Sequence, residues 1–216
     1  MEFENEARDL FKKVDLINYK DLNEKKVKLI TIERLFKVVI FGDQDVGITT
    51  FLKTYTERKF TDERISNTTG VDIFTKDLGI NNERYRFKLW QIKDQKRYKI
   101  LLPAYLEGVD IAIFMYDIMD YLSLFHVDDW LRLIKRNINM QFPMIMVGFK
   151  SDLHHERKVP LAKAIVISKS RGFKEYLECS ALTGENINEI FEEIIKIIMQ
   201  QPQKKQKPKP LLTSIL

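Results

Sequence analysis

The sequence lacks the features that mark secreted and membrane-spanning proteins. It has a single cysteine, Cys179, in 216 residues, so no disulfide can form within the chain. No apolar run approaches the roughly 20 residues of a membrane-spanning helix. The acidic start, residues 1–9, has no apolar segment like that of a signal peptide. These absences predict a soluble, cytoplasmic protein.

The body of the chain also lacks the excess of positive charge that nucleic-acid-binding proteins carry. The net charge is +5, but four lysines lie in an acid-free tail, residues 201–216, and leave about +1 for the rest. We therefore expect no nucleic-acid partner. The tail is rich in proline and lysine, which predicts a flexible segment. We expect at most weak contact with a membrane surface, on the order of 1 kcal/mol per lysine; the tail has no cysteine for prenylation.

Apolar runs and amphipathic stretches alternate along the middle of the chain. Patterns of buried strands occupy residues 38–41, 111–116 and 143–147, and a helical pattern follows each of them. This alternation predicts an α/β fold with a mostly parallel, six-stranded sheet and helices on both faces, in three layers. The expected divisions are a charged N-terminal extension with a short amphipathic helix (1–34), one domain (35–200) and the basic tail (201–216).

A glycine-containing loop joins the first strand to the first helix of this domain. The phosphate-loop pattern G-x-x-x-x-G-K-[ST] is matched at Gly42, Gly47 and Thr49. Glycines let consecutive backbone N–H groups converge on an anion, and the helix N-terminus adds a partial positive charge. Ile48 replaces the lysine, whose bond to a phosphate would contribute about 1.5–3 kcal/mol, and Asp45 adds a carboxylate. The alternative is a strand–turn–helix junction that binds nothing.

Five further stretches follow the phosphate loop in the order known from one family. They are 68–72 (TTGVD, against T-I-G-V-D), 90–98 (WQIKDQKRY, against W-D-T-A-G-Q-E-R-F), 103–105 (PAY, against P-x-Y), 147–152 (VGFKSD, against V-G-N-K-x-D) and 179–182 (CSAL, against S-A-K). On these motifs the span 36–198 resembles a Ras-superfamily small GTPase, closest to the Rab branch. The resemblance implies the three-layer P-loop small-GTPase fold.

One end of the site in that family holds guanine. The resemblance implies that Asp152 accepts two hydrogen bonds from the guanine edge, that Lys150 lays its alkyl stem over the base, and that the Ala181 backbone meets the guanine carbonyl. Phe149 replaces an asparagine that ties this loop to the phosphate loop, and it either packs against the base or fills the hole. The residues implied to contact GTP or GDP are Gly42, Asp45, Val46, Gly47, Ile48, Thr49, Thr50, Lys150, Asp152, Ser180, Ala181 and Leu182.

The metal and catalytic end departs further from the family pattern. The resemblance implies that the hydroxyls of Thr49 and Thr68 hold Mg²⁺. The supporting aspartate is Gln91 here, which offers a dication no charge, so we expect magnesium binding to be weak or absent. Asp94 replaces the glycine whose N–H senses the γ-phosphate. Gln95 matches the glutamine that orients the attacking water; with its neighbours altered, we expect this candidate catalytic residue to be a relic.

A few other polar residues are candidates for phosphate or metal binding. Lys93 either supplies the positive charge that the phosphate loop lacks or is a solvated lysine, and we favour the solvated lysine. His154 and His155 have no third metal ligand nearby in sequence, and His126 has no carboxylate or cysteine constellation around it. Cys179 is expected to be a small buried core residue.

Two functions of different classes remain open. We predict a Rab-like small GTP-binding protein with weakened binding of guanine nucleotide, a preference for GDP, and impaired or absent GTP hydrolysis. The alternative is a nucleotide-independent pseudo-GTPase that acts as a protein-interaction module. The resemblance implies that protein effectors or regulators dock at the switch surface, residues 68–72 and 97–105, in vesicle trafficking or signalling.

Overall fold

The computed structural model describes most of the predicted domain. Its described residues are 34–56, 58–59, 70–80, 83–93, 101–137 and 142–201. The predicted N-terminal helix and nearly all of the basic tail lie outside these ranges, as do Thr68 and Gln95. Within these ranges no helix is both long and apolar enough to cross a membrane.

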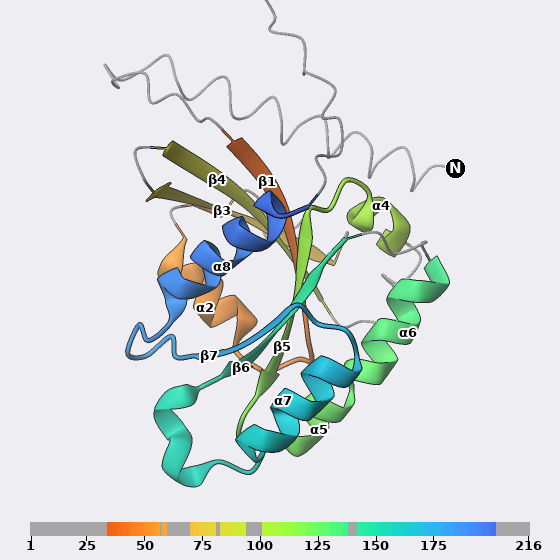
Figure 1. Ribbon diagram of the computed structural model, residues 1–216, viewed down its shortest axis with the longest axis vertical. Helices are drawn as coiled ribbons and strands as arrows, with labels where there is room; N and C mark the ends of the chain where they lie inside the picture. Colours follow the sequence, from red (N-terminus) through yellow and green to blue (C-terminus); the bar gives the residue numbers. More distant parts are fainter. Residues whose placement is uncertain are drawn as a thin grey trace, which may run out of the picture.

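A seven-stranded sheet forms the centre of the fold (Figure 1). Its strands are β1 (Arg34–Phe41), β2 (Arg58–Lys59), β3 (Val71–Ile80), β4 (Glu83–Ile92), β5 (Ile111–Asp117), β6 (Met144–Phe149) and β7 (Glu175–Cys179). The order across the sheet is β2-β3-β4-β1-β5-β6-β7, and only the β2–β3 and β3–β4 pairs are antiparallel. The predicted mostly parallel α/β sheet is confirmed. The two-residue strand β2 is added to the six strands predicted.

Helices cover both faces of the sheet and complete the three predicted layers. They are α2 (Ile48–Tyr55), α4 (Leu102–Leu106), α5 (Tyr121–Phe125), α6 (Val127–Asn137), the 3₁₀ helix η2 (Ser151–Glu156), α7 (Leu161–Ser170) and α8 (Ile187–Met199). In Figure 1, α2 and α8 lie on one face, and α4, α5, α6 and α7 lie on the other. The P-loop small-GTPase architecture expected from the resemblance is therefore present.

Two apolar cores result from the two-residue period of the strands. On β1, Val38 and Ile40 join the core beneath α2 and α8, whereas Val39 and Phe41 join the core beneath α6. Successive strand side chains point to opposite faces, so a strand covered on both sides must be apolar at every position. All seven residues of β5 are buried for this reason.

The parallel strands bring several loops to one edge of the sheet. β4, β1, β5, β6 and β7 run in the same direction, so the residues that follow Ile92, Phe41, Asp117, Phe149 and Cys179 all lie at the carboxyl edge. Ligands of open α/β sheets bind at this edge. The fold thus gathers the predicted phosphate loop and the predicted guanine loops at one place.

Candidate functional site

The phosphate loop has the backbone that its glycines predict. A Cβ at Gly42 would lie 2.2 Å from the carbonyl oxygen of Met115, so no larger residue fits against β5. Gly47 has φ 108° and precedes the first turn of α2, where Phe51 N–H donates to the Gly47 carbonyl at 3.0 Å. Asp45 is exposed with φ 67°, a conformation that an aspartate adopts more readily than most residues. The loop has a strand–turn–helix form that ends at a helix N-terminus.

Ile48, at the position of the missing lysine, is directed into the protein interior. Its side chain is 4% exposed and belongs to the core with Val46 and Phe51. Its Cδ1 atom lies 3.2 Å from where a Cβ of Gly42 would stand, so it fills the space beneath the loop. Thr50, the next position but one, is exposed. The side chain of residue 48 therefore stabilises the loop by packing and adds no charge to it.

Phe149 fills the hole left by the family asparagine. The ring packs so closely on the phosphate loop that a Cβ at Gly47 would be 2.4 Å from Cε1. Phe149 is buried and meets Phe51 edge to face, with ring centroids 6.1 Å apart. Of the two alternatives that the sequence left open, this side chain adopts the one that ties the loops together by apolar contact.

Thr49, one of the two predicted magnesium ligands, pairs with the amide of Gln91. The Thr49 hydroxyl donates to Gln91 Oε1 at 3.2 Å and accepts from Gln91 Nε2 at 2.8 Å. Lys93 Nζ lies 3.6 Å from Asp72 Oδ2, and Asp72 is almost completely buried. Lys93 is therefore an ion-paired, half-buried side chain, and the prediction of a solvated lysine is wrong. In the described part of the chain, no three His, Cys, Asp or Glu residues are grouped as metal ligands.

The predicted guanine end brings three strand ends together. Lys150, in the left-handed conformation with φ 68°, donates to Asp117 Oδ2 at 2.5 Å. The Ser180 hydroxyl donates to Asp152 Oδ1 and accepts the backbone N–H groups of residues 182 and 183 at 3.1 and 3.2 Å. Ala181 lies in the same turn, and its carbonyl accepts the Tyr55 hydroxyl at 3.0 Å. Leu182 is 82% exposed. Lys150, Asp152 and the 180–182 turn are therefore adjacent at this edge of the sheet.

A polar network of Tyr116, Arg157, Tyr176 and Glu178 lies next to these loops. Arg157 donates two hydrogen bonds to the carboxylate of Glu178, at 2.7 and 2.5 Å, and Tyr176 donates to the same carboxylate. The Tyr176 hydroxyl lies 2.8 Å from that of Tyr116. Burial raises the pKa of both tyrosines well above the ordinary range. The network joins β5, β7 and the segment after η2.

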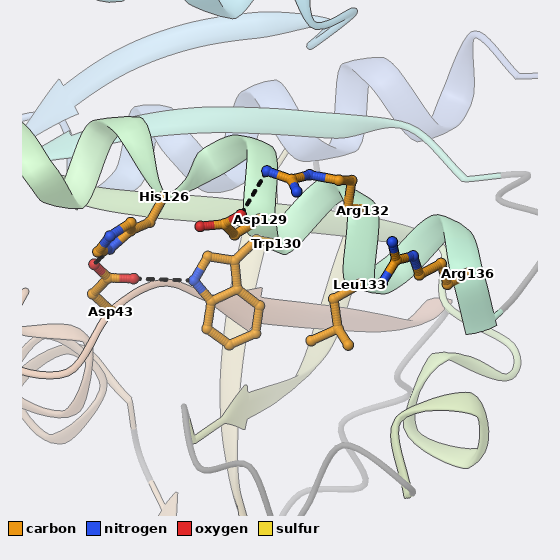
Figure 2. Close-up of a pocket in the computed structure, with 7 residues that line it drawn as sticks. All are labelled: Asp43, His126, Asp129, Trp130, Arg132, Leu133 and Arg136. Atoms are coloured by element: carbon orange, nitrogen blue, oxygen red, sulfur yellow. Dashed lines mark hydrogen bonds and ion pairs between the residues drawn. The ribbon is translucent and has the colours of Figure 1, made fainter.

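A pocket beside the start of the phosphate loop was not predicted from the sequence. It has a volume of about 340 Å³, and Figure 2 shows its lining along α6. Asp43 accepts hydrogen bonds from Trp130 Nε1 at 3.1 Å and pairs with His126 Nδ1 at 2.5 Å. The carboxylate raises the pKa of His126. The prediction that His126 has no carboxylate neighbour is wrong, because the fold brings it to Asp43, which is distant in sequence. The i, i+4 spacing of His126 and Trp130 is the signal in the sequence that could have indicated this pocket.

Two histidines and the single cysteine complete the candidates that the structure describes. His154 and His155 are exposed, and their rings are tilted by 45° with centroids 3.8 Å apart. Cys179 is a free, fully buried thiol whose pKa is raised chiefly by burial, as expected of a core residue.

Comparisons with known proteins agree with this geometry. The sequence model of the Ras family matches residues 37–200. The Ras-related protein Rab-11C of Dictyostelium discoideum is 35% identical over 163 residues, which are 76% of this chain and 72% of that protein. Ras-family GTPases bind GTP or GDP together with Mg²⁺. The chain belongs to the Ras family and is a Rab-like small GTP-binding protein.

Proposed function

We propose that this protein binds guanine nucleotide with reduced affinity and that its GTP hydrolysis is impaired or absent. The observation that carries the proposal is the difference between the two ends of the site. At the base end, the Ser180 hydroxyl donates to Asp152, and the carbonyl of the neighbouring Ala181 accepts a hydrogen bond from Tyr55. At the phosphate end, Ile48 is buried in the core and contributes no positive charge.

Each end has a defined role in this proposal. The Asp152 carboxylate, held by the Ser180 hydroxyl, accepts the two N–H donors of the guanine edge, and Lys150 covers the base. The backbone N–H groups from Gly42 to Thr50 and the N-terminus of α2 hold the phosphates. Without the lysine, phosphate binding loses a charged hydrogen bond of about 1.5–3 kcal/mol. That loss weighs most on GTP, which carries the larger charge, and so supports a preference for GDP.

A second function is supported by the packing of the phosphate end. Ile48 and Phe149 stabilise the loop by apolar contact, so the loop needs no ligand to keep its shape. The protein then acts as a nucleotide-independent interaction module of a cytoplasmic trafficking or signalling pathway. Both functions place effectors or regulators at the switch surface, residues 68–72 and 97–105.

Nucleotide release and titration distinguish the two functions. The full chain is denatured, any released nucleotide is identified by chromatography, and fluorescent GDP and GTP are titrated into nucleotide-free protein. Replacing Asp152→Ala should weaken binding by roughly 100-fold or more, because two guanine donors lose their acceptor. Glu156→Gln is the matched control, since Glu156 is an exposed carboxylate on the same 3₁₀ helix.

Two results would reject the proposed function. A folded protein that binds neither nucleotide at high micromolar concentration would favour the interaction module. Single-turnover hydrolysis at a rate typical of efficient GTPases would show that the altered phosphate end still catalyses the reaction.

A further inference from the structure

Four polar residues meet where the phosphate loop adjoins β3 and β4. Thr49 lies in the first turn of α2, Asp72 on β3, Gln91 on β4 and Lys93 just beyond β4. We refer to these four residues as the junction cluster. Thr49 and Asp72 match the family motifs, whereas Gln91 and Lys93 depart from them.

Strand register places the members of the junction cluster on one face. Asp72 is directly opposite Gln91 in the antiparallel β3–β4 ladder, so their side chains project to the same side. Lys93 is two residues beyond Gln91, and its backbone N–H still donates to the Gly70 carbonyl at 2.9 Å, which continues the ladder. Its ammonium therefore reaches Asp72 diagonally across the two strands, at 3.6 Å.

The described members of this cluster do not fit a magnesium ion. Gln91 is buried, and its amide group takes both a donor and an acceptor position of the Thr49 hydroxyl. Magnesium takes oxygen ligands in octahedral geometry, and proteins usually hold it through one or two carboxylates together with waters and substrate phosphates. Asp72 is the carboxylate at this point, and the Lys93 ammonium lies 3.6 Å from it. A dication placed here would meet a neutral amide and a repelling cation.

We propose that the Lys93 ammonium, held by Asp72, excludes magnesium from the junction cluster, so that guanine nucleotide binds to this protein without a metal. Lys93 places a positive charge just beyond the end of β4. Asp72, whose side chain is 3% exposed against 28% for Lys93, fixes the position of that charge. The ordering of the junction then depends on the chain alone. The inference rests on the proposed nucleotide binding, and its test separates the two.

The first part of the test measures metal dependence of binding. Fluorescent GDP is titrated into the full chain in millimolar magnesium and in excess EDTA. The two dissociation constants of the wild type should agree within about fivefold, the size of a weak surface charge interaction. The double variant Gln91→Asp/Lys93→Gly restores a carboxylate and removes the cation, so magnesium should tighten its binding by about tenfold or more. Gln91→Asn is the matched neutral control and should stay metal-independent.

The second part needs no nucleotide. In Lys93→Met the buried Asp72 carboxylate loses the ammonium that lies 3.6 Å from it, so the thermal midpoint should fall by about 4–8 °C. Magnesium should recover part of this loss in the variant and should not shift the wild type. Asp72→Asn/Lys93→Met should recover most of it in EDTA, because both charges are gone. Arg132→Met breaks an exposed ion pair with Asp129 and serves as the control.

Each result bears on the inference separately from the proposed function. A wild type whose GDP affinity rises tenfold or more with magnesium, or a Lys93→Met variant that melts like the wild type, overturns the inference. If no variant binds nucleotide, the proposed function fails, and the ligand-free melts still decide whether Lys93 excludes magnesium from Asp72.

Discussion

At the scale of single residues, the phosphate loop keeps the two glycines of the phosphate-loop pattern and has Ile48 in place of its lysine. Gly42 and Gly47 keep the backbone close to β5 and β6, where a Cβ would collide with Met115 and Phe149. Ile48 belongs to the core below. The loop is thus stabilised from inside the protein, whereas a lysine would direct its charge toward a bound phosphate.

Replacing Ile48→Lys should have opposite effects on stability and on binding. The new ammonium can reach a phosphate, so GDP affinity should rise roughly tenfold or more. The core loses an aliphatic side chain, so the free energy of unfolding should fall by about 2–4 kcal/mol. Denaturant unfolding and fluorescent GDP titration measure the two effects. Ile48→Met, a volume-matched control, should change stability by less than about 1.5 kcal/mol and leave affinity unchanged; equal affinities for Lys and Met would contradict the prediction.

The His126–Asp43 pair should make stability depend on pH. Hydrogen bonding to Asp43, aided by the charges of Asp129 and Asp120 and opposed by burial, raises the pKa of His126. A raised pKa stabilises the fold fully below the unfolded value of about 6.5, and this stabilisation is lost as pH rises through the folded value. The thermal midpoint of the wild type should therefore exceed that of His126→Gln at low pH, and the difference should shrink toward alkaline pH.

The control for that titration is a second exposed histidine. His155→Gln removes an imidazole that lies against His154 and does not line the Asp43 pocket, so it should leave the pH profile of the wild type in place. A difference between wild type and His126→Gln that stays constant with pH would show that His126 acts by packing alone.

At the scale of elements, the contact between Gly47 and Phe149 joins the start of α2 to the end of β6. Gly47→Ala should reduce the free energy of unfolding by about 2–4 kcal/mol, because φ 108° is strained for alanine and the methyl group meets the Phe149 ring. In a Phe149→Leu background the same substitution should cost less, since one of the two causes is removed. Additive costs in this double-mutant cycle would mean that the ring is not the obstacle.

At the scale of the whole molecule, the hydrogen-bonded β3–β4 ladder runs up to the nucleotide site. Its register is continuous from Ile80 and Glu83 to Val71 and Ile92, and Lys93 extends it to Gly70. With the metal-free binding proposed above, we expect GDP and GTP to leave this ladder equally protected, because the ladder closes through its own backbone hydrogen bonds. Amide hydrogen exchange of residues 71–80 and 83–92 in the two nucleotides measures this. Clearly faster exchange with GDP would indicate an ordinary nucleotide-driven switch.

The local sequence pattern determined the architecture of this protein. The apolar runs at 38–41 and 111–116 predicted buried strands, and the helical patterns that follow them predicted the covering helices, because a period of 2 or 3.6 residues follows directly from backbone geometry. The glycines likewise predicted the backbone shape of the phosphate loop, since a residue without Cβ is required there. Even the loss of the lysine charge at position 48 was visible without a structure.

Only the tertiary structure decided which side chains meet. Phe149 had two possible places, His126 had no visible partner, and Lys93 was expected to be solvated. In the fold, Phe149 packs on Gly47, His126 pairs with Asp43, and Lys93 pairs with Asp72. These contacts join residues far apart in the chain, and their geometry depends on strand order and register. No local periodicity encodes that information, so the chemistry of the altered site emerges only when the sheet is assembled.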